Sequence, residues 1–266
     1  MKFMGPVPIA KVAIKVNETD SRNGPWYVES FKHDYLKIYA HRTDEAAQRE
    51  VNLIIDLLNM QPGSKVLDLC CGHGRHSRAL AQKGFKVTGL DLSAVLLEEA
   101  RKRQKGLPPI RYVQGDVRQL PFEREFDYVL NLFTSFGYFD KRQENITVFD
   151  EIRKVLKPTG LFLIDFLNPG YVKRTLKPYT ERQVDQLKIV ERRKIEDGQV
   201  VKTIEVQEGR SKRYYEERVH LFSASEMKSF IQEAGLQVTG LYGSLAGETY
   251  DADLSERMIL VGQPAD

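Results

Sequence analysis

The chain has 266 residues, of which 41% are hydrophobic and 29% are charged, and its 40 basic and 37 acidic residues give a net charge of +3. This composition is typical of a soluble globular protein. Because basic and acidic residues are nearly equal in number, the net charge gives no support for a nucleic-acid partner. No apolar run approaches the roughly 20 residues that span a bilayer, and the N-terminus lacks the apolar stretch of a signal peptide. The only cysteines, Cys70 and Cys71, are neighbours that cannot staple a fold, so we expect a reducing, cytoplasmic location and no membrane partner.

Residues 1–42 are predicted to form an arm followed by a helix. The arm is rich in proline and glycine and shows no hydrophobic period, which is typical of a loose segment. From Trp26 onward the aromatic residues Tyr27, Phe31 and Tyr35 recur every four positions. That spacing places them on one face of a helix.

From residue 43 the sequence alternates short apolar strands with amphipathic helices. Strands are predicted at residues 65–70, 85–91, 110–116, 126–133 and 160–168, and helices at residues 43–62, 74–83, 93–105 and 146–158. Thr43 and Ser93 are suitable N-caps for two of these helices. Such an alternation predicts an α/β fold, in which a parallel sheet carries helices on both faces.

The alternation stops after Asn168, and three antiparallel strands are predicted in its place. They lie in residues 188–206, a hairpin around Asp197-Gly198, and in residues 213–222. Residues 170–222 are therefore expected to form a small antiparallel β insert. Ser223 and Glu226 then form a capping box at the start of a helix, and residues 236–242 and 257–263 are predicted to return to the main sheet as its last strands.

A glycine turn between the first strand and the next helix indicates a bound nucleoside. Gly72 and Gly74 follow the first strand directly, and Asp91 ends the second strand. Ligands of open parallel sheets bind at the carboxyl ends of the strands, where an acidic residue can accept hydrogen bonds from both ribose hydroxyls. The dinucleotide fingerprint requires a third glycine, where this chain has Ser77. Arg75 could face a carboxylate or a phosphate, so the turn alone does not distinguish NAD from another adenosine ligand.

Four segments, in order, resemble the motifs of the class I S-adenosylmethionine-dependent methyltransferases. They are VLDLCCGHGRHS at residues 66–77, TGLDLS at residues 88–93, QGDVRQLPF at residues 114–122 and FDYVLNLFTSFGYF at residues 126–139. The resemblance implies a Rossmann-like, seven-stranded, mostly parallel sheet with an antiparallel final strand, and S-adenosyl-L-methionine as the cofactor. The core would comprise residues 43–169 and 223–266, and the insert would cover the acceptor side or form a homodimer surface.

The resemblance also implies which residues bind the cofactor. In small-molecule members, such as glycine and sugar N-methyltransferases, an N-terminal lid helix closes over the cofactor with a tyrosine and an arginine. The implied residues are Asp68, Cys70, Gly72, His73 and Gly74 around the glycine turn, Asp91 and Leu92 at the ribose and adenine, Asp116 and Val117 at the other adenine edge, Leu132 near the sulfonium, and Tyr35, Tyr39 and Arg42 in the lid. No metal site is expected. His76, two residues into the predicted helix, is expected at the surface.

The methyl acceptor is expected beside the segment that follows the fourth strand. Enzymes that methylate the N6 atom of adenine in nucleic acids carry an Asn/Asp-Pro-Pro-aromatic motif there, and Asn131-Leu-Phe-Thr departs from it. The departure argues against exocyclic base amines. The candidate acceptor contacts are Phe136, Tyr138, Asn168, Tyr171 and Arg257, and the candidate catalytic residues are Tyr138 and His220.

The sequence thus predicts an enzyme that transfers a methyl group from S-adenosylmethionine to a nitrogen or oxygen atom of a small molecule. The reaction needs an aligned acceptor and the exclusion of water more than it needs a protein nucleophile. Two alternatives remain open: modification of RNA or protein, and a non-catalytic module that binds the cofactor for regulation. All three require the cofactor, so the motifs do not separate them.

Overall fold

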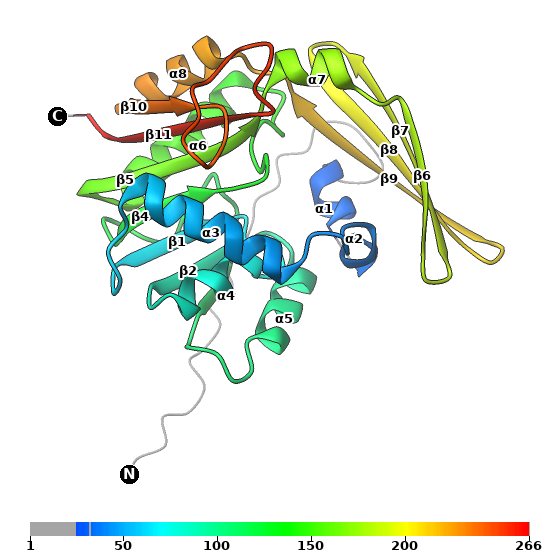
Figure 1. The fold of residues 1–266 in the computed structure, drawn as a ribbon, viewed down its shortest axis with the longest axis horizontal. Coiled ribbons are helices and arrows are strands. Elements are labelled where there is room, and N and C mark those ends of the chain that lie inside the picture. The colour runs from blue at the N-terminus through cyan, green and yellow to red at the C-terminus, as the bar shows by residue number, and fades with distance from the viewer. Residues whose placement is uncertain (1–24, 32, 266) are drawn as a thin grey trace.

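The computed structural model describes residues 25–31 and 33–265, which form an α/β unit with a long antiparallel layer beside it (Figure 1). The arm that the sequence predicts before the first helix lies outside these residues, apart from its last position. Among the described helices, none is both long enough and apolar enough to cross a membrane.

Seven strands make up the main sheet. Across the sheet they follow the order β10 (Leu236–Tyr242), β11 (Arg257–Pro264), β5 (Leu156–Leu167), β4 (Phe126–Asn131), β1 (Lys65–Leu69), β2 (Lys86–Asp91) and β3 (Arg111–Gln114). The pairings from β5 to β3 are parallel, whereas β11 runs antiparallel to both β5 and β10. The predicted sheet with an antiparallel final strand is therefore confirmed. Because the strand order reverses at β1, a crevice opens at the carboxyl ends of β1 and β4.

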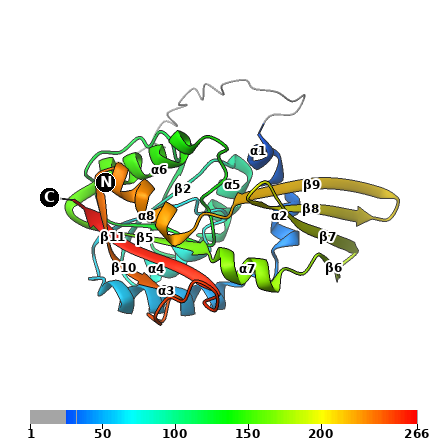
Figure 2. The same ribbon diagram turned by 90° about the horizontal axis from the view of Figure 1, so that it is seen from above.

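Helices cover both faces of this sheet (Figure 2). One face carries α3 (Asp44–Leu58) and α4 (Arg75–Gln82), the other carries α6 (Arg142–Val155) and α8 (Ala224–Glu233), and α5 (Ala94–Arg103) packs beside β2 and β3. Ile54 and Leu80 belong to the buried cluster on the first face, and Phe149 and Phe230 belong to the cluster on the second. Burial of these two apolar layers fixes the sheet and leaves its carboxyl edge free for a site.

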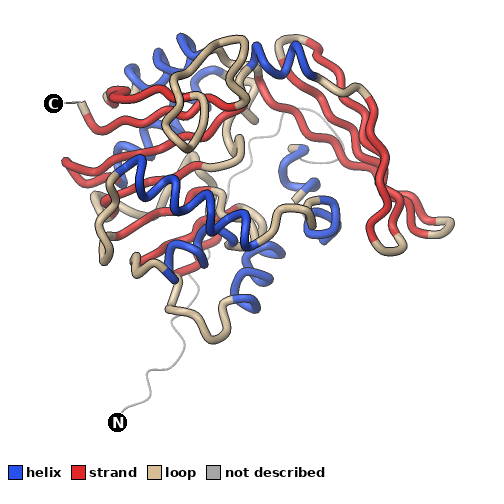
Figure 3. Tube along the Cα trace, in the orientation of Figure 1, coloured by secondary structure: helices blue, strands red, loops and turns tan. Residues whose placement is uncertain are grey.

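A second, antiparallel sheet of four strands lies beside the α/β unit (Figure 3). It follows α7 (Pro169–Thr175) and consists of β6 (Tyr179–Val184), β7 (Leu187–Glu196), β8 (Gln199–Glu208) and β9 (Ser211–His220). The prediction of three strands is wrong by one, because β6 has the sequence YTERQV, without an apolar run, and owes its conformation to pairing with β7. The hairpin turn at Asp197-Gly198 is confirmed: the φ angles are 49° and 73°, as a tight hairpin requires.

Two short helices occupy the segment for which one helix was predicted. They are α1 (Trp26–Ser30) and α2 (His33–Ile38), and we call them the lid. The first helix ends at Phe31, whose carbonyl accepts a hydrogen bond of 2.6 Å from the Ser93 hydroxyl. The contact between the end of the lid and the second sheet is one buried cluster of Ile38, Tyr39, Leu187, Ile189, Ile204 and Val206. The lid therefore rests on the insert and reaches across to the N-cap of α5.

Candidate active site

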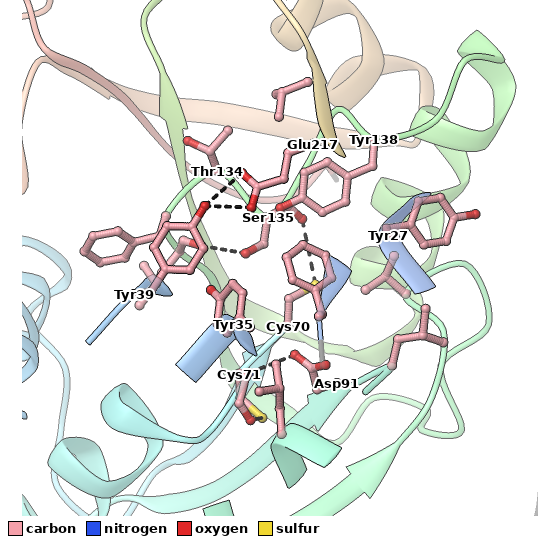
Figure 4. A pocket seen from close by; sticks show the side chains of 18 of the residues that line it. Tyr27, Tyr35, Tyr39, Cys70, Cys71, Asp91, Thr134, Ser135, Tyr138 and Glu217 are labelled. Carbon is pink, nitrogen blue, oxygen red and sulfur yellow. Dashed lines mark hydrogen bonds between the residues drawn. The ribbon is translucent and has the colours of Figure 1, made fainter. Parts of the chain in front are cut away.

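A cavity of about 370 Å³ lies where the carboxyl ends of β1, β2 and β4 meet the lid and strands β8 and β9. Figure 4 shows side chains from the lid, from the ends of β1, β2 and β4, and from β9 around one space. We call the part that contains Gly72 and Asp91 the Asp91 half, and the part that contains Tyr39, Tyr138 and Glu217 the Glu217 half. Both halves belong to the same cavity.

Asp91 forms the floor of the Asp91 half, at the end of β2, and is 8% exposed. Its Oδ2 accepts a hydrogen bond of 2.7 Å from the Gly72 amide, and its Oδ1 accepts one of 2.8 Å from the Ser93 amide. Burial raises the pKa of Asp91 to about 6, although these backbone hydrogen bonds oppose the rise. A carboxylate has about four acceptor positions, so the two oxygens retain positions for a pair of hydroxyl groups.

The turn between β1 and α4 has a backbone that favours glycine. Gly72 and Gly74 have φ angles of 56° and 78°, and a Cβ on Gly74 would lie 2.4 Å from the Tyr112 hydroxyl. Gly72 lines the cavity, whereas Gly74 shapes the turn from behind. Below the turn, Asp68 also lines the cavity and accepts a hydrogen bond of 2.5 Å from the Ser77 hydroxyl, while burial raises the pKa of Asp68.

The other residues that the sequence assigned to this half also reach the cavity. They are Cys70, His73, Leu92, Asp116, Val117 and Leu132. Burial, followed by the charge of nearby arginines, lowers the pKa of His73 to about 4, so its ring is neutral. The carboxylate of Asp116 is held by Arg118, with N–O distances of 2.6 and 3.0 Å, and this pair fixes its orientation toward the cavity edge.

Two arginines flank the ring of Phe133 at the border between the halves. The guanidinium carbon of Arg42 lies 5.3 Å from the ring centroid, and that of Arg75 lies 5.0 Å from it. Arg42 donates a hydrogen bond of 3.4 Å to the Tyr35 hydroxyl, and Arg75 has Glu50 as a counter-charge at 3.8 Å. Among the described residues, the contact of Arg75 with Glu50 is the one ion pair of these two guanidinium groups, so they suit an anionic group of a ligand.

His76 does not lie at the surface, so that expectation is wrong. The residue is 7% exposed and lines the cavity. Its Nε2 lies 2.8 Å from a carboxylate oxygen of Glu50, on α3, and its ring stacks on Phe133. His76 is buried because α3 and the loop after β4 cover the first turn of α4. Its position in the helix alone does not predict these contacts.

Five aromatic rings form much of the wall of the Glu217 half. They belong to Trp26, Phe31, Tyr35, Tyr39 and Tyr138. Ring centroids are 4.9 Å apart for Trp26 and Tyr138, and 4.6 Å apart for Tyr35 and Tyr39. Burial raises the pKa of all three tyrosine hydroxyls. These side chains are therefore neutral and offer ring faces and hydroxyl groups, not phenolate bases.

Two charged residues of the insert, Lys202 on β8 and Glu217 on β9, line the cavity without having been predicted from the sequence. The Tyr39 hydroxyl lies 2.6 and 2.8 Å from the two carboxylate oxygens of Glu217, and the Lys202 ammonium lies 3.3 Å from one of them. A signal was present in the sequence, because Lys202 is in phase with the apolar Ile204 and Val206. In a strand, that phase puts all three on the same face.

Comparison with known proteins identifies the family. Residues 66–160 match a family model described as a methyltransferase domain. The cypemycin N-terminal methyltransferase of a Streptomyces species is 30% identical over 207 residues, which are 75% of this chain and 83% of that protein. An S-adenosylmethionine-dependent methyltransferase from Clostridium acetobutylicum has the same fold, with a TM-score of 0.73 over 88% of this chain and 96% of that chain at 19% identity. The chain belongs to the S-adenosylmethionine-dependent methyltransferases.

Further relatives of this methyltransferase differ in how much of their length matches. A dTDP-3-amino-3,4,6-trideoxy-alpha-D-glucopyranose N,N-dimethyltransferase from Streptomyces venezuelae is 27% identical over 227 residues, or 81% of this chain and 90% of that protein. The similarity to the YqeM protein of Bacillus subtilis is local, with 39% identity over 102 residues that cover 41% of that protein. The family model, which covers residues 66–160, includes Gly72 and Asp91 of the Asp91 half.

S-adenosylmethionine is the cofactor of this family, and the Asp91 half fits it. The open acceptor positions of Asp91 suit two ribose hydroxyls, and Leu92 and Val117 offer apolar surface for an adenine ring. Arg42 and Arg75 suit a carboxylate at the other end. The methyltransferase therefore carries a group for each part of the cofactor in this half.

Phe136 and Tyr171, two residues predicted to contact the acceptor, are not among the residues that line the cavity of the methyltransferase. Phe136 is 3% exposed, and its ring packs 4.9 Å from that of Phe149 and 6.0 Å from that of Phe166. Tyr171 is half-buried on α7. Phe136 therefore supports the sheet from the face that α6 covers.

Asn168 and His220 are also absent from the lining of the cavity. Asn168 is fully buried, and its amide donates hydrogen bonds of 3.0 and 2.7 Å to the carbonyls of Asp251 and Ser255. His220 has its Nε2 at 2.8 Å from the Gln199 amide nitrogen. Both side chains form hydrogen bonds between distant segments of the methyltransferase. Their residue types alone did not predict this structural role.

Arg257 reaches the cavity from β11 and stabilises the turn after β4, residues 132–135, which we call the β4 turn. Its guanidinium donates hydrogen bonds of 2.6 Å to the Asp165 carboxylate and 2.9 Å to the Thr134 hydroxyl. Asp165 in turn accepts a hydrogen bond of 2.9 Å from the Phe133 amide. Phe133 and Thr134 have φ angles of 57° and 60°, a conformation that costs roughly 1–2 kcal/mol for each non-glycine residue.

Proposed function

We propose that this methyltransferase transfers a methyl group to a nitrogen atom of a small-molecule amine held in the Glu217 half. The observation that carries the proposal is the cover over the strand ends, since the lid and the insert leave a cavity of only about 370 Å³. Small-molecule pockets span roughly 300–1,000 Å³. Cofactor and acceptor share this space, so the acceptor must be small.

The names of two relatives support nitrogen as the acceptor atom. One is named for methylation of an N-terminus, and the other for N,N-dimethylation of an amino sugar nucleotide. Both matches are long enough, at 75% and 81% of this chain, to include part of the insert as well as the cofactor-binding part. An amine nitrogen also needs no nucleophile from the protein.

When bound, S-adenosylmethionine supplies a methyl group activated by its positively charged sulfur. Asp91 holds the ribose, Asp116 lies at the adenine, and Arg42 and Arg75 orient the methionine carboxylate. The aromatic rings of the Glu217 half orient the acceptor and exclude water. Such alignment contributes up to roughly 7–11 kcal/mol to lowering the barrier.

We also propose a cytoplasmic location and no nucleic-acid partner. Both cysteines, Cys70 and Cys71, are free thiols, and the net charge of +3 gives no support for a polyanionic partner. A homodimer formed through the insert stays a prediction. Sedimentation of the full chain with and without cofactor would test it.

Transfer of a labelled methyl group tests the proposed function. The full-length protein is incubated with labelled S-adenosylmethionine and three acceptor pools: small amines, purified RNA, and a protein extract. We expect label in the small-amine pool, and mass spectrometry of the product should place the methyl group on nitrogen. Label in RNA or protein, or on oxygen, would contradict the proposal, and cofactor binding without transfer to any pool would favour a non-catalytic module.

A further inference from the structure

The Glu217 half combines one carboxylate with several aromatic rings, and we propose that it is a subsite for a protonated aliphatic amine. The proposal rests on the proposed function and narrows its acceptor to amines that are positively charged at neutral pH. Such an amine binds as the ammonium ion, which has no lone pair, so one N–H proton passes to the Glu217 carboxylate before the nitrogen can accept the methyl group. Ring faces and a carboxylate both attract such cations. A neutral or an anionic acceptor gains little from either.

Glu217 retains acceptor capacity toward the cavity. The Tyr39 hydroxyl lies 2.6 and 2.8 Å from its two oxygens, and the Lys202 ammonium lies 3.3 Å from one of them. Tyr39 has one hydroxyl proton for these two contacts, and a carboxylate has about four acceptor positions. At least one position is therefore open. Figure 4 shows the carboxylate between Tyr39 and Tyr138, where it borders the cavity.

Lys202 does not form a matching site for an anion. Its ammonium group has three N–H donors, and three acceptors surround it. They are the Tyr39 hydroxyl at 2.5 Å, Glu217 at 3.3 Å and Glu191 at 3.4 Å. Glu191 is 3% exposed and is also paired with Arg182 at 3.1 Å. Glu191 is paired with Arg193 as well. The three donors of Lys202 are thus engaged by the Tyr39 hydroxyl, Glu217 and Glu191, and Lys202 positions Glu217.

The tyrosine rings around Glu217 are in the state that favours a cation. Burial raises the pKa of Tyr35, Tyr39 and Tyr138, and the negative charge of Glu217 raises each of them further. The hydroxyls therefore stay neutral, and the rings present their electron-rich faces. The Tyr39 ring already carries the Arg42 guanidinium at 4.2 Å and the Lys202 ammonium at 4.7 Å from its centroid. The proposed subsite therefore relies on the rings of Tyr35 and Tyr138.

Three probes of one shape test the proposal. Cyclohexylamine, cyclohexanol and cyclohexanecarboxylate differ mainly in carrying a positive, a neutral or a negative group. Each is titrated into the full chain saturated with S-adenosylhomocysteine, and the dissociation constant is measured by calorimetry. We expect cyclohexylamine to bind about tenfold more tightly than the alcohol. Equal affinities, preference for the carboxylate, or no binding of the amine at tens of millimolar would overturn the proposal.

A pair of variants on β9 assigns the charge preference to Glu217. Glu217→Gln should weaken cyclohexylamine binding about tenfold and leave cyclohexanol unchanged. Glu216→Gln is the matched control, because the neighbouring residue of a strand faces the other side and Glu216 pairs there with Arg218. Unchanged affinity for S-adenosylhomocysteine in both variants confirms an intact fold. If Glu217→Gln binds the amine as tightly as the unmodified protein does, the proposal fails.

The outcomes separate this proposal from the proposed function. Methylation of neutral amines without any charge preference would keep the proposed function and overturn the ammonium subsite. Charge-selective binding combined with methylation of an oxygen atom would overturn the proposed nitrogen acceptor and keep the subsite.

Discussion

Burial opposes ionisation of the Asp91 carboxyl group in the free protein, whereas hydrogen bonds from a bound cofactor would favour ionisation. Burial raises the pKa of its carboxyl group to about 6, so ionisation at neutral pH is opposed by desolvation. Hydroxyl groups that donate to the carboxylate would favour the ionised form. The residue therefore links cofactor binding directly to its own protonation.

Replacing this carboxylate should weaken cofactor binding. Asp91→Asn should raise the dissociation constant of S-adenosylhomocysteine by about 10- to 100-fold, because hydrogen bonds to a charged group contribute roughly 1.5–3 kcal/mol each. Calorimetry checks the value. Asp127→Asn is the control, since Asp127 lies at the start of β4 and pairs with Lys157 at 2.7 Å. Equal affinities of the two variants would dismiss Asp91 as the ribose ligand.

The same residue predicts how binding depends on pH. Below about pH 6 protonation of Asp91 competes with the ribose, and affinity should fall by up to about tenfold per pH unit. His73 stays neutral in this range, since its pKa is about 4. The stability of the free protein depends on pH in the opposite direction. The pKa of Asp91 is higher in the folded chain than its ordinary value of 3.8, so the free protein gains stability as the pH falls from about 6 toward 3.8. Titrations between pH 5 and 8 should show the fall in affinity, and Asp91→Asn should abolish it.

The β4 turn is an element whose conformation depends on residues far away in the sequence. Phe133 and Thr134 keep left-handed backbone angles because Asp165 and Arg257 hold their amide and hydroxyl groups. The turn places Phe133 between the two arginines that face the cofactor. Strain at this site is thus maintained by an ion pair between β5 and β11.

Breaking this pair should destabilise the protein. Asp165→Asn should lower the free energy of unfolding by about 2–3 kcal/mol, less than the roughly 3–5 kcal/mol of a fully buried pair, because the Arg257 side chain is 28% exposed. Urea denaturation measures the change. Asp127→Asn, which loosens a more exposed pair, should cost much less. If both variants unfolded at a similar urea midpoint, Asp165 would not stabilise the protein in the way proposed.

Local signals in the sequence predicted most of the elements. The N-caps Thr43 and Ser93 and the capping box at Ser223 are confirmed, because each depends on residues three positions apart. The strand β6 and the break at Phe31 were missed. Both depend on partners distant in the sequence, namely β7 and the Ser93 hydroxyl.

The candidate site was predictable only where the fold itself gathers residues. Parallel strands place their carboxyl ends together, and hence the glycine turn after β1 and Asp91 at the end of β2 could be named in advance. Leu132 after β4 was implied by the resemblance to the methyltransferases. Lys202 and Glu217 were missed because charged residues on a strand are usually exposed to solvent. Asn168 and His220 were named for their chemistry, yet contacts with Ser255 and Gln199 keep them out of the cavity lining.

At the level of the whole molecule, the lid is fastened to the insert by polar bonds as well as by its apolar cluster. Asp34 accepts hydrogen bonds of 2.5 Å from Arg213 and 2.7 Å from the Tyr215 hydroxyl. Ser30 donates a hydrogen bond of 2.7 Å to the Glu216 carbonyl. Because lid residues line the same cavity as Asp91, we expect cofactor exchange to require movement of the lid.

Loosening this attachment should speed cofactor release. Asp34→Ala should raise the dissociation rate of S-adenosylhomocysteine several-fold, because the lid opens more often when its ion pair with Arg213 is lost. Stopped-flow displacement measures the rate. Glu208→Gln is the control, since Glu208 contacts Arg213 from the exposed side at 3.0 Å. Identical rates in the two variants would mean that the lid does not gate exchange.

Strand β9 forms hydrogen bonds with the lid and also contributes Glu217 to the cavity. Mutations in β9 that change acceptor specificity are therefore expected to change the dissociation rate of the cofactor as well. Laboratory evolution of acceptor range on this scaffold should meet a trade-off, in which variants with broadened choice lose cofactor sooner unless a compensating change appears in Trp26–Ile38.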